Sequence, residues 1–136
     1  MPCAFCEIAA RRAPADLVYD DGEVLAFLPL EPQSRAHVLV APRRHVEGLF
    51  DAEGPLVNEV MAVVRTLALR MRSRLGATGV NVLHATGPDA QQSVPHLHVH
   101  VLARFANDGL DAWPALPICA LDRAALVTRP SLMDGE

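Results

Sequence analysis

No stretch of this 136-residue chain approaches the roughly 20 uninterrupted apolar residues that a membrane-spanning helix requires. The first residues lack the charged segment and the following apolar segment of a secretory signal. Lysine is absent, and the twelve arginines form no basic block suited to binding along a nucleic-acid backbone. We therefore expect a cytoplasmic protein that binds neither a membrane nor a nucleic-acid polymer.

Cysteine is also scarce, and three residues are an odd number for a disulfide framework. A chain of this length fits one domain and buries a single core without disulfide support. We expect one domain over residues 1–136, with a core over 3–104 and an extended tail over 105–136. The tail contains several prolines, and we expect it to pack through its single tryptophan, Trp113.

The most informative stretch is residues 93–102, in which three histidines alternate with aliphatic residues. In an extended strand, successive side chains leave opposite faces, so His96, His98 and His100 share one face. Imidazoles with near-neutral pKa values serve as nucleophiles, acids, bases or metal ligands. A solvated strand face and a purely metal-binding row are the alternatives. The neighbouring hydrogen-bonding side chains of Gln92 and Ser93 favour a catalytic row.

The remaining patterns predict an α+β domain. The segment 20–23 has the composition of a hairpin turn, and Pro29 and Pro32 exclude a central strand between them. A helical apolar period follows Asp51, with Pro55 in the first turn and Gly76 just after the end. We expect helices over 3–12 and 55–75 and strands over 17–19, 24–28, 37–42, 80–85 and the histidine row.

The long helix has an apolar band wider than packing against one sheet requires, so we expect part of it to meet a second subunit. Cys3 and Cys6 are three residues apart, and a helix places both sulfurs on one face, where zinc could bind. A redox pair is the alternative, and His45 is the candidate partner of the cysteines. His84 is an isolated histidine, a type more often structural than functional.

These segments resemble the histidine triad (HIT) family of nucleotide hydrolases and transferases. The triad reads His-φ-His-φ-His-φ-φ over residues 96–102, where φ is apolar. Further matching segments are 3–8, 24–28, 37–42, 43–46 and 92–94, which follow the family's order along the chain. The resemblance implies a HIT-like fold, with an antiparallel five-stranded sheet, a short N-terminal helix, one long helix and a homodimer formed through the long helix.

The resemblance also implies a reaction at the α-phosphorus of a dinucleoside polyphosphate or a nucleoside phosphoramidate. His98 would be the nucleophile and would form a transient nucleotidyl-histidine. His100 and Ser93 would contact the phosphate or the leaving group, and His37 would support the triad. The implied substrate-binding residues are Gln92, Ser93, Phe27, Leu30 and His100.

Zinc-containing bacterial members of the family imply a structural zinc ion. The ligands would be Cys3, Cys6, His45 and His96, which close a tetrahedral shell and leave no open position for catalysis. No catalytic metal is expected.

Three positions differ from the nucleoside phosphoramidase branch of the family. Pro29 replaces an aspartate that holds the ribose, Ala85 replaces a phosphate-site asparagine, and Gln91 replaces a glycine. These differences leave an alternative open, in which the chain is a zinc-stabilised nucleotide-binding or scaffold protein with little turnover.

Overall fold

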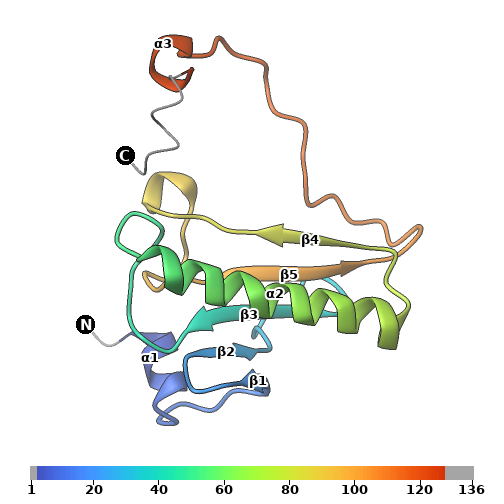
Figure 1. Ribbon diagram of the computed structural model, residues 1–136. Coiled ribbons are helices and arrows are strands. Elements are labelled where there is room, and N and C mark those ends of the chain that lie inside the picture. The colour runs from blue at the N-terminus through green and yellow to red at the C-terminus, as the bar shows by residue number, and fades with distance from the viewer. Residues whose placement is uncertain (1–2, 128–136) are drawn as a thin grey trace.

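The computed structural model describes residues 3–127, and an open antiparallel sheet forms its centre (Figure 1). The sheet has five strands in the order β1-β2-β3-β5-β4. Its strands are β1 (Leu17–Asp20), β2 (Val24–Phe27), β3 (His37–Pro42), β4 (Gly79–Leu83) and β5 (Val99–Arg104). The helices are α1 (Ala4–Ala9), α2 (Gly54–Leu75), the 3-10 helix η1 (Pro88–Ala90) and α3 (Arg123–Leu126). The expected fold class is therefore confirmed.

The two faces of the sheet are covered by different helices. Period-two alternation sends Val38, Val40, Val99 and Val101 to the face that packs against α2. The opposite face carries Leu25, Phe27, Leu39 and Ala41, which pack with residues of α1. Figure 1 shows the long helix α2 lying across the sheet. The triad histidines thus lie on the α1 side, because they alternate with the residues that face α2.

Helix α2 begins and ends where its sequence predicts. Pro55 lies in the first turn, where no intrahelical donor is lost, and Gly76 closes the helix in the left-handed conformation with φ 72°. Apolar side chains at helical spacing, among them Val60, Val64 and Leu67, are buried against the sheet. None of the helices between residues 3 and 127 has the length and apolarity to span a bilayer.

The histidine row enters the sheet later than its alternation predicts. Strand β5 begins at Val99, because Leu97 donates its N–H to the carbonyl of Val46 (2.7 Å) and His96 donates to Val94 (2.8 Å). The alternation of faces nevertheless continues upstream of the strand. Leu97 packs with Val46 on the α2 side, and His96 and His98 are buried on the other side. The alternative of a solvated histidine face is therefore wrong.

The segment after β5 behaves differently from expectation. Trp113 is 80% exposed, so the expectation that it anchors the tail is wrong for the single chain. The segment departs from the sheet beyond Asp108, and Pro114 and Pro117 remove donors that pairing with a strand would require. Figure 1 shows residues 110–127 extending away from the sheet toward α3.

Candidate functional site

A cavity of about 200 Å³ lies where the triad meets the end of β4 and the segment 84–93. Its lining residues are Gln33, Leu83, His84, Ala85, Ala90, Gln91, Gln92, Ser93, His98 and His100. Among these described residues none carries a Lys, Arg, Asp or Glu side chain. The cavity is therefore polar but without formal charge while its histidines are neutral.

The His98 imidazole is held by its own backbone neighbourhood. Its Nδ1 lies 2.8 Å from the carbonyl oxygen of His96, and a carbonyl only accepts, so Nδ1 carries the proton. The other nitrogen, Nε2, keeps its lone pair. Phe5 of α1 packs edge-on against the ring, with centroids 5.0 Å apart. Burial lowers the pKa of His98, which favours the neutral ring that a nucleophile requires.

His100 is held in the opposite tautomer. The Gln33 N–H donates to Nδ1 of His37 (3.1 Å), so the proton of the His37 ring is on Nε2. That Nε2 donates to Nδ1 of His100 (2.9 Å), which leaves the His100 proton on its Nε2. Burial, with the charges of neighbouring histidines, lowers the pKa of His100 to about 4. His98 thus offers a lone pair, whereas His100 offers a proton.

Gln92 lines the cavity, but its amide is committed to the main chain. Nε2 donates to the carbonyls of Glu47 (2.6 Å) and Val94 (2.9 Å), and Oε1 accepts the N–H of Gly87 (2.8 Å). Gln92 therefore fixes three segments around the cavity. Ser93, the next residue, lines the same cavity.

Two other expected substrate-binding residues do not line this cavity. Phe27 is 2% exposed, and its ring packs against Phe5 with centroids 5.1 Å apart. Leu30 is 99% exposed in the loop after β2. The structure thus brings together His98, His100, Ser93 and Gln92, with His37 behind His100.

Sequence reasoning gave little weight to His84 and missed Gln33. His84 Nδ1 lies 2.8 Å from the carbonyl oxygen of His98, across the end of β4. Gln33 acts through its backbone N–H, which no side-chain pattern reveals. The one sequence signal for His84 was an imidazole at the end of an apolar strand.

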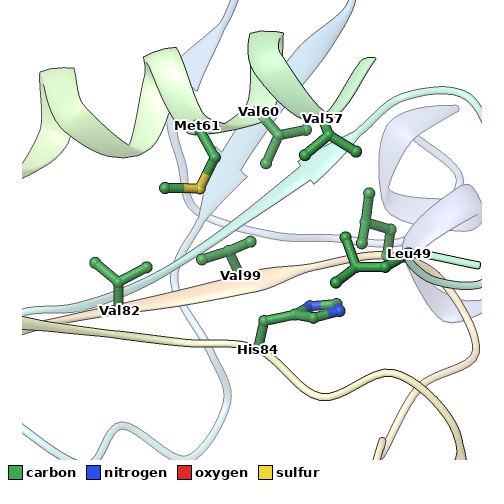
Figure 2. A pocket seen from close by; sticks show the side chains of 8 residues that line it. Leu49, Val57, Val60, Met61, Val82, His84 and Val99 are labelled. Atoms are coloured by element: carbon green, nitrogen blue, oxygen red, sulfur yellow. The ribbon is translucent and has the colours of Figure 1, made fainter. Parts of the chain in front are cut away.

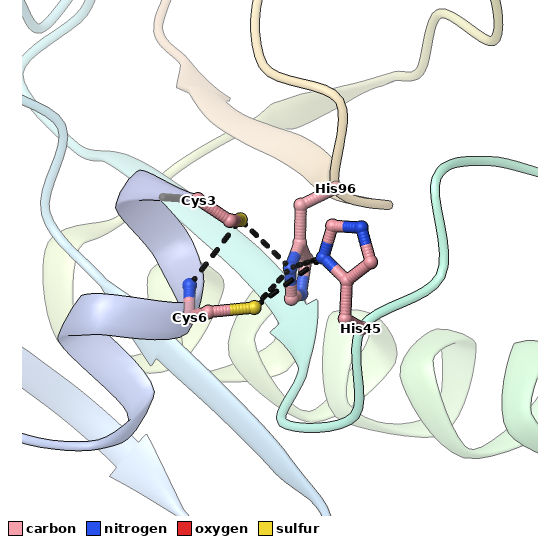
Figure 3. A group of neighbouring side chains, drawn as sticks. All are labelled: Cys3, Cys6, His45 and His96. Atoms are coloured by element: carbon pink, nitrogen blue, oxygen red, sulfur yellow. Dashed lines mark hydrogen bonds between the residues drawn. The ribbon is translucent and has the colours of Figure 1, made fainter. Parts of the chain in front are cut away.

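Cys3, Cys6, His45 and His96 form a second cluster, on the α1 side of the triad (Figure 3). Their four ligand atoms all lie within 4.8 Å of one another. His96 Nε2 donates to the carbonyl of Pro42 (2.8 Å), so Nδ1 presents its lone pair to the cluster.

The spacing of these atoms fits a tetrahedral ion. Cys3 Sγ and His96 Nδ1 are 3.4 Å apart, Cys6 Sγ and His45 Nδ1 are 3.3 Å apart, and the two Nδ1 atoms are 3.2 Å apart. Zinc bonds of about 2.0–2.3 Å place neighbouring ligands of a tetrahedron about 3.3–3.8 Å apart. Two thiols and two imidazoles are also the donors that zinc prefers, so the residues fit this ion.

Comparisons with known proteins agree on one family. A family model described as HIT domain matches residues 10–107. An uncharacterised HIT-like protein of Methanocaldococcus jannaschii is 36% identical over 108 residues, which are 79% of this chain and 82% of the relative. The protein hit of Bacillus subtilis is 35% identical over 111 residues, which are 81% of this chain and 77% of that protein.

Solved structures give the same result. A zinc-bound histidine triad family protein from Mycobacterium smegmatis superposes with a TM-score of 0.79 at 36% identity, over 82% of this chain and 81% of that one. A HIT family member from Bacillus subtilis superposes with a TM-score of 0.77 at 30% identity, over 99% of this chain and 92% of that one.

Proposed function

This chain belongs to the histidine triad (HIT) family, and on that basis we propose that it is a nucleotide hydrolase or transferase that reacts at the α-phosphorus through His98. The observation that carries the proposal is the bond from His98 Nδ1 to the carbonyl of His96. That bond keeps the proton on the inner nitrogen, so the lone pair of Nε2 is available for attack.

The proposed reaction has two steps. His98 Nε2 forms a bond to the α-phosphorus while the bond from phosphorus to the leaving group breaks, which gives a nucleotidyl-histidine. His100 Nε2–H and the Ser93 hydroxyl donate to the phosphate oxygens or the leaving group. Water or another acceptor then attacks the phosphorus, releases the nucleotidyl group and restores the neutral His98.

The cavity lining bears on the leaving group. A polyphosphate leaving group carries several negative charges and is usually neutralised by Arg, Lys or a metal ion. The described lining offers only neutral donors. This supports a substrate whose leaving group carries no polyphosphate charge, such as a nucleoside phosphoramidate, over a dinucleoside polyphosphate. Turnover of a panel containing both classes decides between them.

His98→Asn tests the mechanism. An amide can still donate a hydrogen bond but cannot bond to phosphorus, so turnover should fall by several orders of magnitude while nucleotide binding persists. Mass spectrometry of the wild-type protein during turnover should locate an acid-labile nucleotidyl adduct on His98. Full activity of His98→Asn, or an adduct on another residue, would contradict the proposal. Nucleotide binding by the wild type without any turnover would favour the alternative of a binding or scaffold protein.

We also propose that Cys3, Cys6, His45 and His96 hold a structural zinc ion that ties α1 to the triad. Elemental analysis of purified protein should find about one zinc per chain, because structural sites of this type bind tightly. Cys3→Ser should lose the metal and unfold at lower temperature. Cys119→Ser is the matched control, since Cys119 is exposed and distant in sequence. Equal metal content in both variants would reject this site.

The proposed homodimer rests on apolar surface beside α2. An apolar cavity of about 250 Å³ lies between α2 and the edge strand β4 (Figure 2). Met61 and Val82, which line it, are 44% and 40% exposed. A second copy placed against α2 and β4 would cover this surface and the open edge of the sheet.

A further inference from the structure

His84 lines both of the cavities described above. It follows the last residue of β4 and lines both the polar cavity with His98 and the apolar cavity beneath α2. Figure 2 shows its ring extending from the end of β4 toward Leu49. The mechanism proposed above does not use this side chain, although its ring nitrogens make two hydrogen bonds.

The direction of every hydrogen bond around His84 is determined. The carbonyl of His98 can only accept, so His84 Nδ1, at 2.8 Å, carries the ring proton. Nε2 is then an acceptor, and the Thr86 hydroxyl must donate to it. The same hydroxyl oxygen accepts the N–H of Leu49 (3.0 Å). A continuous chain of donors thus runs from Leu49 through Thr86 and His84 to the backbone of His98.

The outer end of this chain is fixed by packing. A Cβ at Gly48 would come within 2.8 Å of the Thr86 methyl group, so Thr86 fits against a position that only glycine leaves open. Asp51 accepts the N–H of Gly48 (2.9 Å) and of Glu47 (3.0 Å), which holds that loop in place. The hydroxyl of Thr86 is therefore held between the N–H of Leu49 and Nε2 of His84.

The backbone of His98 is where such support is needed. β4 ends at Leu83 and β5 begins at Val99, so His98 lies just outside the assigned strand ladder. A displacement of about 1 Å at a reacting group can cost about a hundredfold in rate. The side chain of His84 supplies a fixed donor to His98 at this point.

We propose that His84 is a positioning residue, which holds the His98 carbonyl through its Nδ1–H and so sets the approach of the nucleophile. The inference rests on the proposed function of His98. The positioning role requires one specific interaction, the hydrogen bond from His84 Nδ1–H to the carbonyl oxygen of His98. A merely structural His84 would instead fill the apolar cavity, and any apolar side chain of similar size would serve.

Two nearly isosteric variants separate these roles. In His84→Asn the amide nitrogen takes the place of Nδ1 and can still donate to the His98 carbonyl. In His84→Leu a methyl group stands there, which suits the apolar cavity but donates nothing. If His84 positions the nucleophile, kcat should fall at least about tenfold further in His84→Leu than in His84→Asn, with KM changed little. A structural role predicts the reverse order, because leucine fills apolar space better than asparagine.

The links upstream of His84 are tested at Thr86. Thr86→Ser keeps the hydroxyl, whereas Thr86→Val keeps the shape against Gly48 and loses the donor to His84. Thr86→Val should therefore lower kcat more than Thr86→Ser, and the ¹⁵N resonance of His84 Nε2 should shift to that of a ring nitrogen without a hydrogen-bond donor while Nδ1 stays protonated. An Nε2 resonance of His84 that is unchanged in Thr86→Val would contradict the proposed donor chain.

A readout without substrate keeps this proposal distinct from the proposed function. The rate of His98 acylation by diethyl pyrocarbonate, mapped by peptide mass spectrometry, reports how Nε2 is presented whether or not a nucleotide is cleaved. We expect the rate to change in His84→Leu and to return toward the wild-type value in His84→Asn. An inactive wild-type protein that shows this pattern would reject the proposed function and retain the positioning role. Equal rates in all three proteins would overturn the role of His84.

Discussion

The Nδ1 partner determines what each triad imidazole can do. Nδ1 of His98 faces a carbonyl oxygen and must therefore donate a hydrogen bond. Nδ1 of His100 faces the Nε2–H of His37 and must therefore accept one. Two identical side chains two residues apart thus offer a lone pair and a proton. The backbone N–H of Gln33, which lies outside the triad, fixes the tautomer of His37 and through it that of His100.

Substitution of His37 tests whether its hydrogen bond fixes the tautomer of His100. His37→Leu removes the donor to His100, so the His100 proton is free to move to Nδ1, and we expect kcat to fall by about tenfold to a hundredfold. His37→Gln is the matched control, since its amide nitrogen reaches the position of Nε2 and can donate. Steady-state kinetics on a nucleoside phosphoramidate provide the measurement. Equal losses in the two variants would mean that His37 acts by packing.

The lowered pKa of His100 predicts how stability depends on pH. Between pH 6.5 and about 4 the unfolded state binds a proton at this residue and the folded state does not. The contribution is therefore complete above about pH 6.5 and is lost as the pH falls toward 4. Urea denaturation of His100→Asn should give a flatter dependence than the wild type in this window.

At the scale of elements, the loop 84–93 has its shape because Gln92 binds three main-chain groups. Gln92→Glu keeps the acceptor for Gly87 but directs a carboxylate at the carbonyls of Glu47 and Val94. We expect a loss of roughly 1 kcal/mol in stability, because two hydrogen bonds of a partly buried side chain are lost. Hydrogen exchange should accelerate over residues 85–94 and not in β1 or β2. Unchanged exchange in this loop would show that the loop keeps its shape without the hydrogen bonds of Gln92.

The sequence predicts elements better than it predicts where they meet. Alternation around His96 identifies both faces of the row, because neighbouring positions in an extended chain face opposite sides. It does not predict that β5 begins at Val99, since the bond from Leu97 to Val46 joins distant segments. The α1 helix is shorter than its composition suggests, ending at Ala9 ahead of Arg11, which has φ 60°.

The same limit applies to the candidate site. The triad, Ser93 and the four cluster residues carry recognisable chemistry at recognisable spacing. Gln33 contributes a backbone N–H, and His84 contributes through the carbonyl of His98 just before β5, so neither leaves a local pattern. Phe27 lies in a strand whose four residues are all buried, and its ring is enclosed by α1 and does not line the cavity.

At the scale of the whole molecule, the apolar surface beside α2 predicts self-association. Met61→Arg places a charge on the cavity beneath α2, so we expect it to shift a dimer to monomer. Ala62→Arg is the control, because Ala62 is exposed on the same turn and does not line the cavity. Light scattering on size-exclusion fractions gives the mass directly. A wild-type protein that is monomeric at micromolar concentration would reject the dimer.

The proposed zinc site and the triad share His96, and that residue lies 93 positions from Cys3 and 54 from Pro42 along the chain. Contacts of such high sequence separation form late, since a long loop must close before they stabilise anything. During synthesis, Cys3, Cys6 and His45 leave the ribosome long before His96 follows. A chain released before residue 96 would carry three of the four proposed metal ligands and would lack the proposed nucleophile. Because His96 and His98 lie in one short segment, the proposed metal shell can be completed only after the segment that carries His98 has been synthesised, so zinc uptake by a growing chain would report that this segment has docked.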